Sequence, residues 1–326
     1  MFSVVLNSLL ASLPIFVFFA IGYVLRRQGV VKPQDDGVMM GLAVDVAYPC
    51  LVFYNIMRTM VVEANPVVSS FSFSLSAIGC GFLELAAGVL AAYLIAKLLR
   101  LKVGTGLRTF SVTSGMQNYA FFVIPVVQML FTAPNDPTLG VLFVHNMGCE
   151  IFVWSAAVLL IGGGALPLKS LLRGPLIAMV GSLLLAWSGL GAYLTVPPVM
   201  KTAEMLGAVA TPLCLIIFGC SMFDLCKDFK WQPRLLLSGL LARLVLAPAF
   251  ILLLAWALPV DPLIKRIMVI QSAIPCAVIS VVLAKRFGGK PEMSTQILLS
   301  TTVCSFITLP IWLTLGNMFV CPIMGE

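Results

Sequence analysis

The chain has 326 residues, of which 60% are hydrophobic and 10% are charged, and its formal net charge is +7. A soluble domain carries roughly 25% charged residues, so this chain has too little polar surface to be a soluble globule. The positive charge does not by itself indicate nucleic acid, because membrane proteins collect Lys and Arg in their cytoplasmic loops. We therefore predict an integral membrane protein with the lipid bilayer, and no nucleic acid, as its partner.

Continuous apolar runs of about 20 residues predict transmembrane helices rather than the alternating strands of an outer-membrane barrel. Ten spans are expected, at residues 4–25, 38–57, 71–99, 108–131, 138–162, 174–195, 203–223, 235–258, 264–286 and 296–319. The predicted fold class is thus an all-α polytopic membrane protein.

Basic residues alternate between the loops that join these spans. Loops after the odd-numbered spans hold 15 Lys and Arg residues, loops after the even-numbered spans hold 4, and Arg243 falls inside the eighth span. Cytoplasmic loops carry the excess of positive charge. We therefore expect a multi-pass protein of the cell (inner) membrane with both termini on the non-cytoplasmic side.

Two spans combine an amide side chain with a following proline. Asn118 precedes Pro125 by seven residues in the fourth span, and Gln271 precedes Pro275 by four residues in the ninth. Proline lacks an N–H and clashes with the carbonyl four residues back, so it breaks or kinks a helix. In hydrocarbon a break is tolerated only beside protein or a water-filled cavity. Pro125 and Pro275 are therefore predicted to mark two broken helices.

The two halves of the chain share this order of features. The second span reads Val46-Ala47-Tyr48-Pro49 and the seventh reads Val209-Ala210-Thr211-Pro212. Because five spans per half insert the second half upside down, we predict an inverted 5 + 5 repeat, with residues 1–165 as the first unit and 166–326 as the second. Paired interrupted helices in such repeats point to the binding site of a secondary transporter.

At these residues the chain resembles the auxin efflux carrier family, which includes the plant PIN carriers and bacterial carriers of malonate, malate and similar acids. The resemblance rests on the span-4 spacing of Asn118 and Pro125, on the run from Ala273 to Phe287, and on Ser294-Thr295 and Thr308-Leu309-Pro310 in span 10.

This resemblance implies a scaffold domain of spans 1–2 and 6–7 and a transport domain of spans 3–5 and 8–10. It also implies that the broken helices 4 and 9 cross at the centre, that the transport domain moves like an elevator, and that a homodimer forms through the scaffold. The long cytoplasmic loop of plant members is replaced by a short link, about Gly163 to Gly174.

The start of each half-helix behaves like roughly +0.5 charge, so two such ends would attract a carboxylate without a buried Arg or Lys. Polar residues beside the breaks are candidate substrate ligands: Gln117, Asn118, Tyr119, Gln271 and Ser272. The alternative is that the amides only cap the broken backbone.

Ionisable residues inside spans are costly, and each calls for a functional hypothesis. Asp45, Glu84, His145 and Glu150 are candidates for proton or cation coupling. The structural alternatives are that Asp45 bonds to the kinked backbone, that the glutamates pair with Arg243 or with each other, and that His145 is a packing residue.

No catalytic set is found. The chain has one histidine and nine cysteines without a C-x-x-C pair, and no nucleophile–base motif is evident. We expect no enzyme activity, no cofactor and no metal site.

The favoured function is a secondary transporter of small organic anions, such as malonate, malate or auxin-like acids, with alternating access at the crossing of spans 4 and 9. Two alternatives stay open: a sodium- or proton-coupled cation exchanger of related fold, and a membrane sensor or assembly subunit that binds an acid without moving it. An inside-negative potential favours export of a monovalent anion by about 2.3 kcal/mol per 100 mV, so uptake would need a coupled ion.

Overall fold

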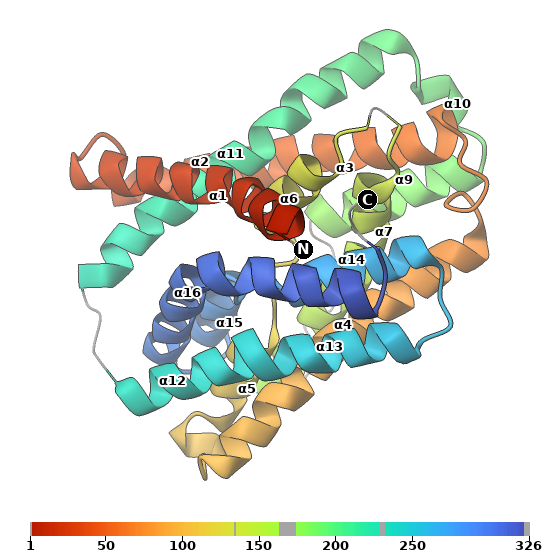
Figure 1. Cartoon of the computed structure of the whole chain (residues 1–326). Coiled ribbons are helices and arrows are strands. Elements are labelled where there is room, and N and C mark those ends of the chain that lie inside the picture. The colour runs from red at the N-terminus through yellow and green to blue at the C-terminus, as the bar shows by residue number, and fades with distance from the viewer. Residues whose placement is uncertain (1, 134, 163–173, 228–231, 323–326) are drawn as a thin grey trace.

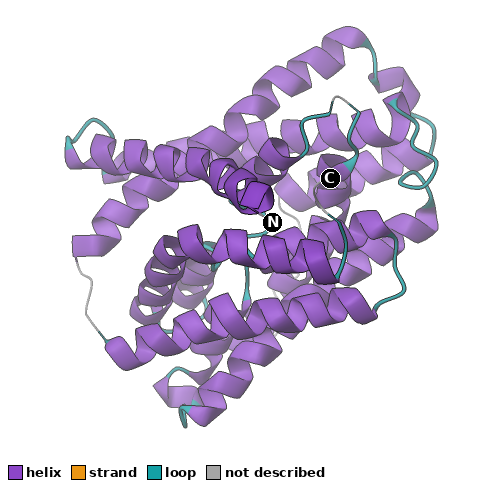
Figure 2. Cartoon of the chain, in the orientation of Figure 1, coloured by secondary structure: helices purple, strands orange, loops and turns teal. Residues whose placement is uncertain are grey.

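The computed structural model describes residues 2–133, 135–162, 174–227 and 232–322. Within them the backbone is almost entirely helical and contains no β-strand (Figure 2). The all-α prediction is therefore confirmed for the part of the chain that the structure describes.

The helices follow one another along the chain with short connections. In the first half they are α1 (Phe2–Arg27), α2 (Asp36–Gly41), α3 (Tyr48–Met57), α4 (Phe71–Leu98), α5 (Leu107–Gly115), α6 (Val123–Leu130), α7 (Thr138–Phe152) and α8 (Val158–Gly162). In the second half they are α9 (Gly174–Trp187), α10 (Gly191–Leu194), α11 (Pro197–Lys227), α12 (Pro233–Leu241), α13 (Ala247–Ala257), α14 (Pro262–Ser272), α15 (Ile279–Arg286) and α16 (Pro291–Phe319).

Six helical stretches among the described residues are long and apolar enough to cross a membrane. They are Pro33–Val62, Phe71–Leu98, Thr138–Gly162, Pro197–Cys226, Pro233–Ala257 and Pro291–Phe319. The count of ten spans and the inverted repeat stay predictions, and the boundary expected at residues 165 and 166 lies outside the described residues.

The fourth and ninth predicted spans are each interrupted. The first interruption separates α5 from α6, and the second separates α14 from α15. Pro275 lies inside the second interruption, whereas Pro125 is the third residue of α6, so the first break precedes its proline. Proline is tolerated there because the N–H groups of a first helical turn have no partner within the helix.

Two groups of helices pack separately and meet along one boundary. In the first group α1 packs along α11, and α3 packs on α9 and α11. In the second, α4 packs on α5, α7 and α13, while α16 packs on α12, α14 and α15. Contacts of α1 with α6 and α16, and of α3 with α7, join the groups. Figure 1 shows α1 and α11 crossing in the upper part of the molecule, with α12, α13 and α16 below.

Short π-helical segments interrupt several long helices, among them η2 (Leu42–Ala47) and η7 (Ala242–Leu246). Each is followed within two residues by a proline, Pro49 or Pro248. Proline has no N–H to donate to the carbonyl four residues back. After η7 that carbonyl belongs to Leu244, and it accepts a bond from Trp312 Nε1 at 2.7 Å. The helix irregularity that carries Arg243 is thus stabilised from α16.

Candidate functional site

The two helix interruptions cross and pair through their backbones. The Asn118 N–H donates to the Pro275 carbonyl at 2.9 Å, and the Ala277 N–H donates to the Met116 carbonyl at 2.9 Å. This is a short antiparallel bridge. The polar backbone that each break exposes is therefore partly satisfied by the other break, which is how irregular backbone is tolerated at membrane depth.

A cavity of about 30 Å³ opens beside this crossing, at the boundary between the two helix groups. It is lined by Phe19 of α1, by Phe218, Ser221, Met222 and Leu225 of α11, by Asn118, Phe122 and Val278 of the interruptions, and by Leu298, Leu299 and Thr302 of α16. The volume suffices for only one or two water molecules. Aromatic and apolar side chains thus surround a few polar groups in this small space.

Phe122 and Val278 are the N-cap residues of α6 and α15, so both half-helices start at this cavity. Neither N-cap side chain caps its helix with a hydrogen bond. Helix N-termini present N–H groups and a partial positive charge, which favours anions. The arrangement can therefore attract a carboxylate to the space beside Asn118.

The opposite ends of the broken helices meet a buried cation. Arg243 is fully buried, and its guanidinium donates to the carbonyls of Ile274 (2.9 Å), Gly115 (3.2 Å), Ser272 (2.8 Å) and Gln271 (3.5 Å). These carbonyls stand at the C-terminal ends of α5 and α14, where the helix dipole is negative. The sequence predicts that the half-helix N-termini attract a carboxylate without a buried Arg or Lys, and this stays a prediction. Arg243, supplied by η7, lies at the opposite, C-terminal ends of the broken helices.

A polar network links Arg243 to two ionisable groups. Gln117 accepts from Arg243 Nη1 (3.4 Å) through its Oε1, and its Nε2 donates to Glu84 Oε1 (2.8 Å) and Gln271 Oε1 (3.3 Å). Glu84 Oε2 in turn lies 3.2 Å from His145 Nε2. All five side chains are fully buried.

Gln271 carries the network on toward the first interruption. Its Nε2 donates to Asn146 Oδ1 at 2.7 Å and lies 3.3 Å from His145 Nδ1. Asn146 Nδ2 donates to the Tyr119 carbonyl at 2.8 Å. Gln271 therefore fixes the position of the extended backbone in the other half of the crossing.

Close contact between α4 and α7 brings Glu84 to His145. A Cβ placed on Gly81 would lie 2.1 Å from the carbonyl oxygen of His145, so no larger residue fits without displacing a helix. Small residues allow helix backbones to approach closely in membranes. Gly81 lies nearly one turn before Glu84, so this contact holds the carboxyl against the imidazole.

The predicted substrate ligands separate into two environments. Asn118 lines the cavity, whereas the side chains of Gln117 and Gln271 point into the buried network. Tyr119 is buried, and the Ser272 hydroxyl donates to the Val269 carbonyl at 2.7 Å. Substrate contact by these five residues stays a prediction.

The predicted coupling residues also separate. Glu84 and His145 are joined in the network, whereas Glu150 Oε2 accepts from Trp154 Nε1 at 2.8 Å. Asp45 is exposed on η2, and its carboxylate lies against the position of Gly174. Arg243 donates hydrogen bonds to backbone carbonyls and so stabilises the broken backbone. The sequence offered a different role for it, an ion pair with one of the glutamates.

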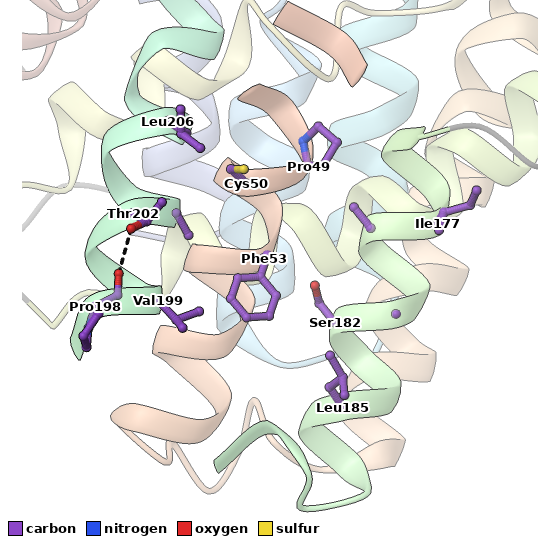
Figure 3. A pocket seen from close by; sticks show the side chains of 13 residues that line it. Pro49, Cys50, Phe53, Ile177, Ser182, Leu185, Pro198, Val199, Thr202 and Leu206 are labelled. Atoms are coloured by element: carbon purple, nitrogen blue, oxygen red, sulfur yellow. Dashed lines mark hydrogen bonds between the residues drawn. The ribbon is translucent and has the colours of Figure 1, made fainter. Parts of the chain in front are cut away.

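A larger groove of about 620 Å³ lies between α3, α9 and α11 (Figure 3). Its lining is apolar apart from the Ser182 and Thr202 hydroxyls, and Thr202 donates to the Pro198 carbonyl at 2.8 Å. Among the described residues no charged side chain lines this groove, and it lies away from both helix interruptions. We therefore assign the candidate site to the small cavity rather than to this groove.

The sequence profile of one known family matches nearly the whole chain. The profile of the family described as "Membrane transport protein" matches residues 8–165 and 163–313. The chain belongs to this auxin efflux carrier-like family. The resemblance stated from the motifs is thereby confirmed, and the chain is a membrane transport protein rather than a member of an enzyme family.

Two archaeal relatives align along almost their full length. A protein of Methanothermobacter thermautotrophicus named an uncharacterized transporter is 24% identical over 310 residues, covering 92% of this chain and 95% of the relative. A second uncharacterized transporter, from Methanocaldococcus jannaschii, is 20% identical over 308 residues, covering 91% and 95%. Neither name specifies a substrate.

Sequence reasoning missed the contribution of the first helix group to the cavity. Phe19 and Ser221 sit in long apolar helices, where nothing in the local pattern separates a cavity-lining residue from a lipid-facing one. For Arg243 a signal was present, because an arginine inside an apolar span requires a buried partner.

Proposed function

We propose that this protein is a secondary carrier of small organic anions that bind at the crossing of the α5–α6 and α14–α15 interruptions. One observation carries the proposal: Asn118 and the N-caps of both half-helices line the same cavity. Two helix N-termini and an amide supply hydrogen-bond donors without requiring an exposed cation. Carboxylates such as malonate, malate or auxin-like acids fit this set of groups.

The position of the cavity supports alternating access. Its walls come from α1 and α11 on one side and from the interruptions and α16 on the other. We assign α1–α3 and α9–α11 to a scaffold, which also forms a homodimer, and the remaining helices to a transport domain. Sliding of the transport domain along α1 and α11, in the manner of an elevator, would open the cavity first to one side of the membrane and then to the other.

The same proposal includes ten spans in a 5 + 5 inverted repeat, with both termini on the non-cytoplasmic side of the cell membrane. The excess of basic residues in the odd loops supports this orientation. In this arrangement we expect the crossing near the middle of the bilayer, where a binding site of a secondary transporter belongs.

Counterflow in liposomes tests the function directly. The full chain is reconstituted with an unlabelled acid inside, and labelled malonate, malate or indole acetate is added outside. Transient accumulation of label above its external concentration identifies a carrier. Saturable binding of an acid without any counterflow would instead favour the sensor, and sodium-dependent proton flux without acid transport would favour the cation exchanger.

A further inference from the structure

The network beside the crossing contains two polar atoms that face each other and have no other partner within the described structure. Glu84 Oε2 and His145 Nε2 are both fully buried, make no other hydrogen bond there, and lie 3.2 Å apart. A proton between them satisfies both atoms, and without one two acceptors would face each other in a site shielded from water.

The surrounding amides determine where that proton sits. Gln271 Nε2 has two hydrogens, and its two acceptors are Asn146 Oδ1 and His145 Nδ1. Its Oε1 accepts from Gln117 Nε2. His145 Nδ1 is thus an acceptor, so the neutral ring carries its hydrogen on Nε2, directed at the Glu84 carboxylate.

A second proton on the ring would disturb this arrangement in a defined way. A protonated Nδ1 is a donor and would face the NH₂ group of Gln271, which is also a donor. The side-chain amide of Gln271 would therefore have to rotate so that its oxygen faces Nδ1. Turning it removes the donor from Asn146 and the acceptor from Gln117. Asn146 donates to the Tyr119 carbonyl, so the rearrangement caused by a proton on His145 would be transmitted to the backbone next to Asn118.

Few other titratable groups face the pair. Cys80 of α4 and Cys149 of α7 are close enough to act on the Glu84 charge, and η7 contributes Arg243. From α14 and the first interruption the facing groups are the amides of Gln271 and Gln117, which do not titrate. With Glu84 ionised, its charge offsets that of Arg243, and the cluster is neutral while His145 is neutral.

A proton on His145 therefore leaves one uncompensated positive charge in a buried site, which is costly. A carboxylate bound beside Asn118 restores neutrality. The proton and the anion then stabilise each other, and this coupling is reciprocal.

We propose that His145, held beside Glu84, binds one further proton when the anion site fills and releases it when the anion leaves, so that one proton moves with each monovalent carboxylate. The proton enters from the aqueous side that the site faces and leaves on the other. This rests on the proposed carrier function for the transport step, but not for the proton site itself. Combined movement of one proton and one anion carries no net charge, so the membrane potential does not oppose uptake.

The single histidine of the chain allows the proton site to be observed without substrate and without mutation. Protein labelled with ¹⁵N-histidine gives the signal of His145 alone. We expect the neutral Nε2–H form at high pH and conversion to the imidazolium in a single one-proton step as the pH is lowered. In Glu84→Gln, which removes the counter-charge, the imidazolium signal should be lost. A ring that never protonates in the unmodified protein, or one that titrates alike in both proteins, overturns the proposal.

Transport in liposomes then tests the coupling. An inward proton gradient should accelerate uptake of a carried monovalent carboxylate several-fold, and a potassium–valinomycin potential should leave uptake unchanged. In Glu84→Gln the rate of uptake should be the same with and without the proton gradient. Glu63→Gln makes the same substitution at a carboxylate that pairs with Arg58 instead (2.7 Å), and should keep the acceleration by the gradient.

The two arms fail separately. If no acid is carried by the unmodified protein, the carrier function is wrong, and the histidine titration still decides the proton site. If acids are carried at a rate that does not depend on the proton gradient, the proposed proton coupling is refuted and the carrier function stands.

Discussion

The backbone N–H of Asn118 donates to the carbonyl of Pro275 at 2.9 Å, while the Asn118 side chain lines the cavity between the two helix groups. The backbone of this residue joins the two interruptions, and within the described structure its side-chain amide makes no hydrogen bond. The structural role thus belongs to the main chain, which every substitution except proline retains. The side chain is available for a ligand.

Replacing Asn118 with alanine should weaken binding of a carried acid by about 10- to 100-fold, because a hydrogen bond to a charged group contributes roughly 1.5–3 kcal/mol. The melting temperature in detergent should change little, since the Pro275 contact persists. Affinity is measured by concentration-dependent counterflow or calorimetry. Equal affinity in the two proteins would exclude Asn118 from the site.

Arg243 should be essential for a stable crossing. Arg243→Met leaves several carbonyls of α5 and α14 without donors and Glu84 without its nearby positive charge, so we expect a loss of about 3–5 kcal/mol of folding free energy. Arg243→Lys keeps the charge but not the planar set of donors, so it should recover only part of the loss. Thermal unfolding in detergent compares the three proteins, and equal stability of the Met variant would refute this role.

The contact between α4 and α7 can be tested with two neighbouring glycines. Gly81→Ala places a Cβ 2.1 Å from the His145 carbonyl, whereas a Cβ on Gly79 of the same helix has no atom within 4 Å. We expect Gly81→Ala to lower the melting temperature and Gly79→Ala to leave it the same or slightly higher, because alanine favours the helix. The measurement is thermal unfolding, and similar effects at both positions would contradict the close approach of these two helices.

Motion between the two helix groups can be tested by reversible cross-linking of introduced cysteine pairs. Phe16 of α1 packs edge-on against Phe306 of α16 across the boundary, with ring centroids 5.1 Å apart. A cysteine pair at these positions, in a background without the nine native cysteines, should stop counterflow when joined by a bifunctional thiosulfonate reagent and recover when the cross-link is reduced.

A matched pair lies within one helix group. Tyr23 of α1 packs against Phe223 of α11 with the same 5.1 Å separation. Cross-linking a cysteine pair there should leave counterflow unchanged, because both helices belong to the proposed scaffold. Full transport with the Phe16–Phe306 pair cross-linked would rule out sliding at this boundary.

The sequence alone determined the class of protein and the position of its breaks. Apolar runs bounded by charge and proline predicted helices close to those observed, because the helical period and the cost of an unpaired backbone act locally. The same local rule predicted that both prolines mark breaks. In the structure Pro275 lies within one break, whereas Pro125 lies just after the other.

Only the tertiary structure decided what surrounds those breaks. It showed that Asn118 turns to a cavity while Gln117 and Gln271 turn to a buried network, although all three looked alike in sequence. It also brought Arg243, Glu84 and His145 together from three separate helices. Such meetings depend on helix packing and close glycine contacts between distant segments, and no local pattern in the chain records which face of a buried helix meets which neighbour.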